Sequence, residues 1–107
     1  MAKFTVETTG FAALTITELM LQECILKGVF EEEDAKRLLQ AAARRHEEAA
    51  TGSLEKIQMN MEVATLIRSL SAGLEPLFER KRKERKKHRK KRKKQLKKQK
   101  MQKTVSE

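Results

Sequence analysis

The residues of this chain that could do chemistry are mostly cations, and they gather between Arg80 and Lys94. Thirteen of these fifteen positions are Lys or Arg. A run of this density attracts anionic polymers and surfaces, of which nucleic acid is the commonest. The residues predicted to contact phosphate are Arg80, Lys81, Arg82, Lys83, Arg85, Lys86, Lys87, Arg89, Lys90, Lys91, Arg92, Lys93 and Lys94, with Lys97, Lys98, Lys100 and Lys103 adding to them.

Side chains that would read a base sequence are missing from this segment. No Phe, Tyr or Trp follows Phe78 to stack on unpaired bases. The chain also carries no zinc-finger or helix-turn-helix signature. We therefore expect contacts led by phosphate with little sequence specificity, to RNA, DNA or another polyanion. There are three other interpretations of this basic segment: a solvated charge run without a ligand, a nuclear or nucleolar import signal, and attachment to anionic lipid.

Catalytic and metal-binding residues are sparse. The single cysteine, Cys24, lies in an apolar stretch without a nearby histidine or cation to activate it. His46, between Arg45 and Glu47, is interpreted as a solvated helix residue. The acids at 31–34 are consecutive, so on a helix they point in different directions, and their charge suits a first helical turn. We expect no enzyme activity, no cofactor and no metal site.

Charge divides the chain in two. The segment 79–107 holds 17 of the 25 Lys and Arg residues against three acids, whereas residues 1–78 hold 8 basic and 12 acidic residues. This partition predicts a flexible lead-in at 1–14, a helical body at 15–78 and a polybasic tail at 79–107. Without a signal peptide, the chain is expected to be soluble and intracellular, and nuclear or nucleolar if the source is eukaryotic.

Helix signals set the elements of the body. Thr15 and Glu18 have capping-box spacing, which predicts the start of a first helix that ends at Gly28. A second helix is expected over about 31–50, followed by a turn at 51–53. A third helix should begin at Leu54.

The only proline marks the end of this body. Pro76, close behind Gly73, predicts a kink or break in the helix between them, because proline lacks an amide donor and clashes with the preceding turn. A further segment then leads into the tail as a long basic helix or a disordered chain, since Lys, Arg and Gln favour a helix but their like charges oppose it. The predicted fold class is all-α, with a small three-helix body.

The first helix is apolar over most of its circumference, which is typical of a helix buried on several sides. Either the other two helices of the body cover it, or a homo-oligomer or helical protein partner does so, with Leu19, Met20, Ile25 and Leu26 at the interface. The stretch 11–26 contains Glu18 and Glu23 and is short for a bilayer, so no stable membrane insertion is expected. The predicted function is non-enzymatic binding of nucleic acid by the tail while the body oligomerises or binds a partner. The alternative is a protein-interaction adaptor whose tail serves localisation or solubility.

Overall fold

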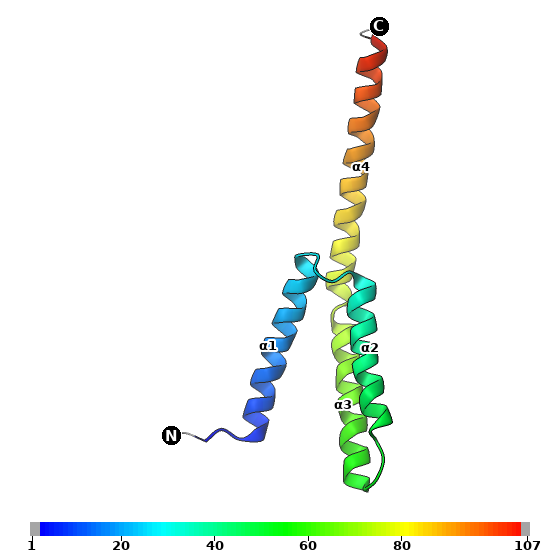
Figure 1. Cartoon of the computed structure of the whole chain (residues 1–107). Helices are drawn as coiled ribbons and strands as arrows, with labels where there is room; N and C mark the ends of the chain where they lie inside the picture. Colours follow the sequence, from blue (N-terminus) through cyan, green and yellow to red (C-terminus); the bar gives the residue numbers. More distant parts are fainter. Residues whose placement is uncertain (1–2, 106–107) are drawn as a thin grey trace. The chain divides into compact units, whose positions relative to one another are not determined.

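The computed structural model describes residues 3–105, and the helices of this range are joined by short turns (Figure 1). They are α1 (Val6–Leu26), α2 (Glu32–Glu48), α3 (Leu54–Gly73) and α4 (Glu75–Val105). No strand occurs within these residues, and the predicted all-α fold class is confirmed. The parts of the predicted lead-in and tail at 1–2 and 106–107 lie outside the described residues.

α1 begins nine residues earlier than the sequence predicts. Thr5 is its N-cap, and the Thr5 Oγ1 accepts a hydrogen bond from the Thr8 amide at 3.1 Å. The predicted cap, Thr15, instead donates its hydroxyl to the Phe11 carbonyl at 3.0 Å, inside the helix. The lead-in predicted over 1–14 is therefore wrong from Val6 onward, because threonines that satisfy the preceding turn are compatible with a helix.

α1 ends just before a glycine, as predicted. Gly28 has φ of +75°, a conformation that side chains with a Cβ rarely adopt. It allows the amides of Val29 and Phe30 to fold back onto the Cys24 carbonyl, at 2.8 and 3.1 Å. The acids at 31–34 then begin α2, where the Glu31 amide donates to the Asp34 Oδ2 at 3.2 Å. These acids satisfy a helix start, in agreement with the interpretation from sequence.

α2 and α3 form an antiparallel hairpin whose two helices lie side by side (Figure 1). Small side chains allow this close approach, since Ala35, Ala43 and Ala64 are buried together with Leu39. The turn between the helices uses Gly52 at φ of +91°, and Ser53 caps α3 by accepting from the Lys56 amide at 3.2 Å. Both ends of α2 and the start of α3 match the prediction to within two residues.

The chain divides into two units after Glu75. α3 ends at Gly73, Leu74 interrupts the helix, and α4 begins at Glu75, so the predicted break is confirmed. The first unit, which we call the body, contains α1, α2 and α3. The second is α4, whose 31 residues span roughly 46 Å at 1.5 Å per residue. The division lies three residues before the predicted domain boundary, because the new helix begins at Glu75, directly before the proline.

Candidate nucleic-acid interface

α4 is helical because its composition favours a helix at every position after the proline. No Gly or Pro follows Pro76, and Lys, Arg, Glu and Gln are strong helix formers. Arg80 and Glu84 add an opposite-charge pair one turn apart, at 3.9 Å. Repulsion opposes these terms, since eight pairs at spacing four within 80–94 join two cations. Each such pair destabilises a helix by about 0.2–0.5 kcal/mol, which amounts to about 2–4 kcal/mol in all.

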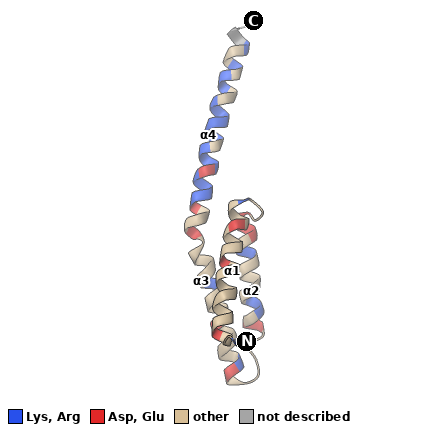
Figure 2. Ribbon diagram, turned by 90° about the vertical axis from the view of Figure 1, so that its left-hand side faces the viewer, with Lys and Arg blue, Asp and Glu red and all other residues tan. Residues whose placement is uncertain are grey.

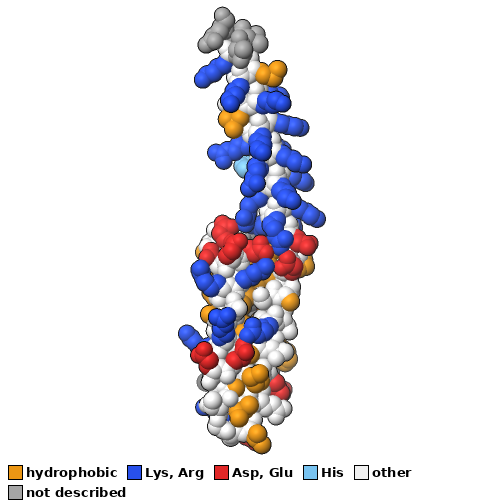
Figure 3. Space-filling view, turned by 90° about the vertical axis from the view of Figure 1, so that its right-hand side faces the viewer, with side chains coloured by type: hydrophobic (Ala, Val, Ile, Leu, Met, Phe, Trp, Pro, Cys, Tyr) orange, Lys and Arg blue, Asp and Glu red, His pale blue; other side chains and the backbone are white. Residues whose placement is uncertain are grey.

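The cations surround the helix and do not form a single stripe. Figure 2 shows that Lys and Arg occur along most of α4, and Figure 3 shows their side chains extending from α4 on the visible face. At 100° per residue, one side of the helix carries a set of four that we call the first face, and a second face is centred about 140° around the helix from it. The first face is Arg82, Lys86, Arg89 and Lys93, and the second face is Lys87, Lys91, Lys94 and Lys98.

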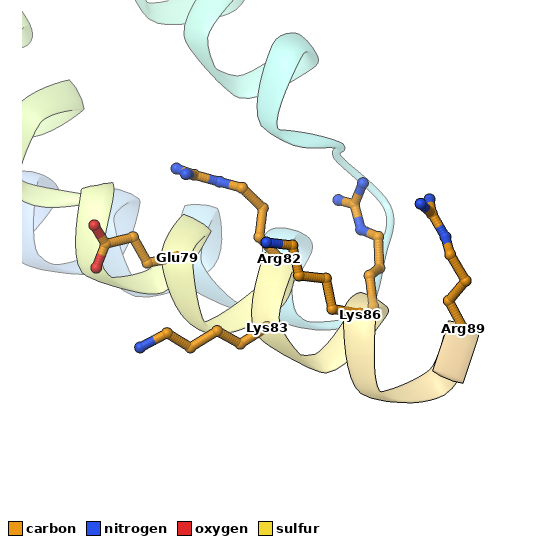
Figure 4. A pocket seen from close by; sticks show the side chains of 6 residues that line it. Glu79, Arg82, Lys83, Lys86 and Arg89 are labelled. Atoms are coloured by element: carbon orange, nitrogen blue, oxygen red, sulfur yellow. The ribbon is translucent and has the colours of Figure 1, made fainter. Parts of the chain in front are cut away.

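Lys and Arg side chains on neighbouring turns of α4 hold their charged ends apart, which leaves room for anions between them. Figure 4 shows labelled side chains extending outward from successive turns of α4 near its beginning. A recess of about 480 Å³ lies there, lined by Glu79, Arg82, Lys83, Arg85, Lys86 and Arg89. Glu79 is the only acid of this lining, so the recess is strongly cationic.

The axial spacing of the charges is a second geometric property. Arg80–Lys94 is a continuous helical segment, about 22 Å long at 1.5 Å per residue. Its thirteen cations therefore recur about every 1.7 Å along the axis, and duplex DNA carries one phosphate charge per roughly 1.7 Å of its own axis. The helix thus matches the linear charge density of a nucleic-acid duplex with the opposite sign.

All thirteen residues predicted to contact phosphate lie on this one element, and twelve of them are exposed, whereas Lys81 is half-buried. The structure thus brings the predicted cations together on one rod. It separates the predicted partner residues, since Leu19, Met20 and Leu26 are exposed but Ile25 is buried. The prediction that Ile25 belongs to an open partner surface is therefore wrong, because it lies on the covered side of α1.

A polar pair between α2 and α3 was not found from the sequence. His46, expected to be solvated, is half-buried, and its Nδ1 lies 3.0 Å from the Oδ1 of the buried Asn60. The Asn60 amide also donates to the carbonyls of Lys56 and Ala49, at 2.9 and 3.3 Å. The expectation of a solvated His46 is wrong, because the hairpin brings residues fourteen apart into contact. The only sequence signal for this contact was an asparagine in the otherwise apolar stripe of the third helix.

Metal-ligating side chains are scattered over the part of the chain that the structure describes. No group of three His, Cys, Asp or Glu residues could hold a metal ion there, and Cys24 is a half-buried thiol in the body. Comparison with protein-family models, with curated proteins and with solved structures finds no match for this chain.

Proposed function

We propose that this chain is a non-enzymatic nucleic-acid-binding protein in which α4 contacts phosphates and the body oligomerises or binds a partner. The observation that supports phosphate binding best is the charge spacing of α4, one cation per about 1.7 Å over the segment 80–94. Duplex nucleic acid presents phosphate charge at that density along a line. Binding to them releases condensed counterions, which provides the free energy of association.

The distribution of cations around α4 suits a ligand that surrounds the helix. An α-helix including its side chains is about 10–12 Å across, and the major groove of duplex DNA is about 12 Å wide. Cations of the first face and of the second face would then reach the phosphates of opposite groove walls. A flat anionic surface would engage only one of these faces at a time, so the arrangement favours a nucleic acid over a membrane.

Sequence specificity should be low. From residue 79 onward the helix has no Asn, and its three Gln residues lie at 95, 99 and 102. Bidentate contacts to adenine use Asn or Gln, and contacts to guanine use Arg or Lys held at a fixed position. Cations at nearly every position give no fixed register, so the contacts position the helix without reading the bases.

Coupling between helix stability and binding supports the same proposal. The eight like-charged pairs at spacing four repel one another until an anion lies between them. Phosphate removes this repulsion, so binding should increase the stability of α4. The same coupling would not arise with a ligand that contacts the helix at a single point.

The test is a binding titration of the full chain with a short DNA duplex of each of two unrelated sequences, a single-stranded RNA and heparin. A variant with the thirteen cations of 80–94 replaced by Gln is the matched control, since Gln keeps the helix propensity. We expect affinity for duplex to fall roughly 10³–10⁵-fold between about 50 and 200 mM salt. The two duplexes should differ by less than tenfold.

Two results would count against the proposal. Absence of binding at low salt would rule out α4 as a nucleic-acid element. A heparin affinity well above that for every nucleic acid would favour the alternative, in which the basic tail serves localisation.

A further inference from the structure

α1 is covered on one side only. Ile25 is its single buried residue, and Leu14, Glu18 and Leu21 form a half-buried stripe on the same side. This stripe faces the α2–α3 hairpin and repeats at spacings of three and four, as expected for one helix face. The remaining circumference of this 21-residue helix has no cover from the described residues of the body.

The uncovered side is apolar as far as Met20, and further along the same side Glu23 is paired with Lys27 at 3.7 Å. Ile16, Leu19 and Met20 lie opposite the half-buried stripe and are 58%, 57% and 63% exposed. No charged residue occurs between Glu7 and Glu18, so this side has an uncharged stretch of about three turns. We call Ile16, Leu19 and Met20 the outer face of α1. A helix apolar on both sides is normally buried on both sides.

A groove beside α1 forms the second half of the surface. It has a volume of about 570 Å³ and lies between α1 and the hairpin. Its hairpin wall includes Leu38, Ala42, Leu66, Ile67 and Leu70, and Phe11 and Leu14 line the α1 side. Leu38 and Leu66 remain 47% and 46% exposed. The only charged residue in the lining is Glu7, so the occupant must be apolar and uncharged.

We propose that the occupant is α1 of a second copy of this chain. In this arrangement the two α1 helices lie side by side as a middle layer between two hairpins. The half-buried stripe of each α1 packs on its own hairpin, and its outer face packs on the groove wall of the other copy. The contact is isologous, so it closes as a dimer. The proposal specifies the oligomerisation that we proposed for the body, and it is independent of phosphate binding by α4.

The exposed apolar area is sufficient for a stable dimer. At about 200 Å² for a fully exposed large apolar residue, the outer face with Phe11, Leu38 and Leu66 leaves roughly 700 Å² uncovered in each copy. Phe4 and Val6, which are 76% and 90% exposed, raise this to roughly 1,000 Å². A stable protein interface buries about 800 Å² on each partner.

The groove is filled by side chains and not by a whole helix. A cylinder of the length of α1 and about 10 Å across occupies roughly 2,400 Å³, several times the volume of the groove. The outer face would therefore insert its row of side chains while the backbone of that helix runs along the mouth. This is the ordinary way in which helices pack, ridges of one entering grooves of the other.

Within residues 3–105, α1 is the best candidate to fill the groove. α4 has no apolar face after Phe78, since only Leu96, Met101 and Val105 interrupt its polar residues. A lipid bilayer is the other candidate, because α1 is long and apolar enough to cross one by length and composition, contrary to the shorter stretch expected from sequence. Glu18, near its middle, would disfavour insertion by about 2.5–3.5 kcal/mol, the value for a charged residue at the centre of a span. Insertion would also leave Leu38 and Leu66 uncovered.

The experiment measures the mass of the full chain by sedimentation equilibrium after nuclease treatment, in about 1 M salt. At that ionic strength the phosphate contacts of α4 are screened, whereas apolar association is retained. Failure of dimerisation and failure of nucleic-acid binding are therefore measured separately. We expect a dimer with a Kd in the micromolar range or tighter, which is typical of this interface size.

Three variants test the arrangement. Met20→Glu and Leu66→Glu each place a carboxylate in the proposed interface, on the outer face and on the groove wall, and should weaken dimerisation at least about 100-fold. Met59→Glu is the matched control, since Met59 is 58% exposed and lies outside the groove lining. The dimerisation Kd of this control should stay within about threefold of that of the original chain.

Four outcomes would overturn the proposal. A monomer at about 100 μM would do so, because a micromolar Kd predicts nearly complete association at that concentration. So would a dimer that is unaffected by Met20→Glu. A dimer sensitive to Met20→Glu but not to Leu66→Glu would indicate that the outer faces contact each other. Co-flotation with uncharged phosphatidylcholine vesicles in 1 M salt would assign the outer face to lipid.

Discussion

Whether α4 binds with all of its circumference or with one side is decided by two variants of equal charge. In the first, the four cations of the first face, Arg82, Lys86, Arg89 and Lys93, are changed to Gln. In the second, the four lysines of the second face are changed to Gln. Each variant removes four charges from one side of the same helix, and Gln retains the helix propensity at every site.

The magnitude follows from the number of cations. Four residues are about a quarter of the 17 basic residues after residue 78. If the whole tail makes about eight phosphate contacts, a proportional loss is about two contacts, and the slope of log K against log salt falls by about two. The electrostatic contribution to binding vanishes at about 1 M salt. At about 0.1 M salt, each variant should therefore bind roughly 50-fold more weakly than the original chain. The two variants should give the same loss within a few fold, because the ligand contacts both sides.

The assay is fluorescence anisotropy with a labelled DNA duplex over a salt series, which gives the affinity and the slope for each variant. Circular dichroism at each salt concentration verifies that helix content is unchanged. If only one face carried the contacts, its variant would lose about four contacts and roughly 10³–10⁴-fold in affinity, and the other would bind normally. That asymmetry would refute the argument that a ligand surrounds α4.

Two predictions concern the stability of the body and are measured by urea unfolding followed by circular dichroism. Asn60→Ala should lower the free energy of unfolding by about 1–3 kcal/mol, since it leaves the half-buried His46 Nδ1 without its partner. The Ala49 carbonyl keeps its hydrogen bond from the Thr51 amide. The exposed Gln58→Ala should change the free energy by less than about 0.5 kcal/mol, and equal effects would contradict the role given to Asn60. Gly28→Ala should destabilise by about 1 kcal/mol because its φ is +75°. By contrast, Gly10→Ala, which meets no atom within 4 Å inside α1, should stabilise by about 0.5–1 kcal/mol.

The parts of the fold that were predicted correctly are those set by local chemistry. Gly28, Gly52 and Ser53 each determine a helix end through their own backbone or hydroxyl group, so the boundaries of α2 and α3 follow from neighbouring residues. The proline breaks the helix for a similarly local reason. The start of α1 was missed because two threonine caps compete, at Thr5 and Thr15, and nothing in the sequence alone decides between them.

The parts that were not predicted depend on contacts distant in sequence. His46 and Asn60 belong to different helices, and only the hairpin register brings Nδ1 and Oδ1 to 3.0 Å. The groove beside α1 likewise requires the wall formed by Leu38 and Leu66. Composition located the candidate phosphate contacts on α4 because charge needs no tertiary structure to accumulate. For the body, composition gave an excess of apolar surface but not the position of the groove.

The two proposals lead to a joint consequence. A dimer through α1 would carry two copies of α4, and after one of them binds a nucleic acid, the second binds at the effective concentration set by the tether. The number of phosphates engaged could then exceed what the 17 basic residues of one tail can reach. Met20→Glu leaves every cation of α4 in place, so any change it makes in nucleic-acid binding must come through association. On a long duplex it should lower both the affinity and the salt slope, whereas on a duplex too short for two copies it should change neither.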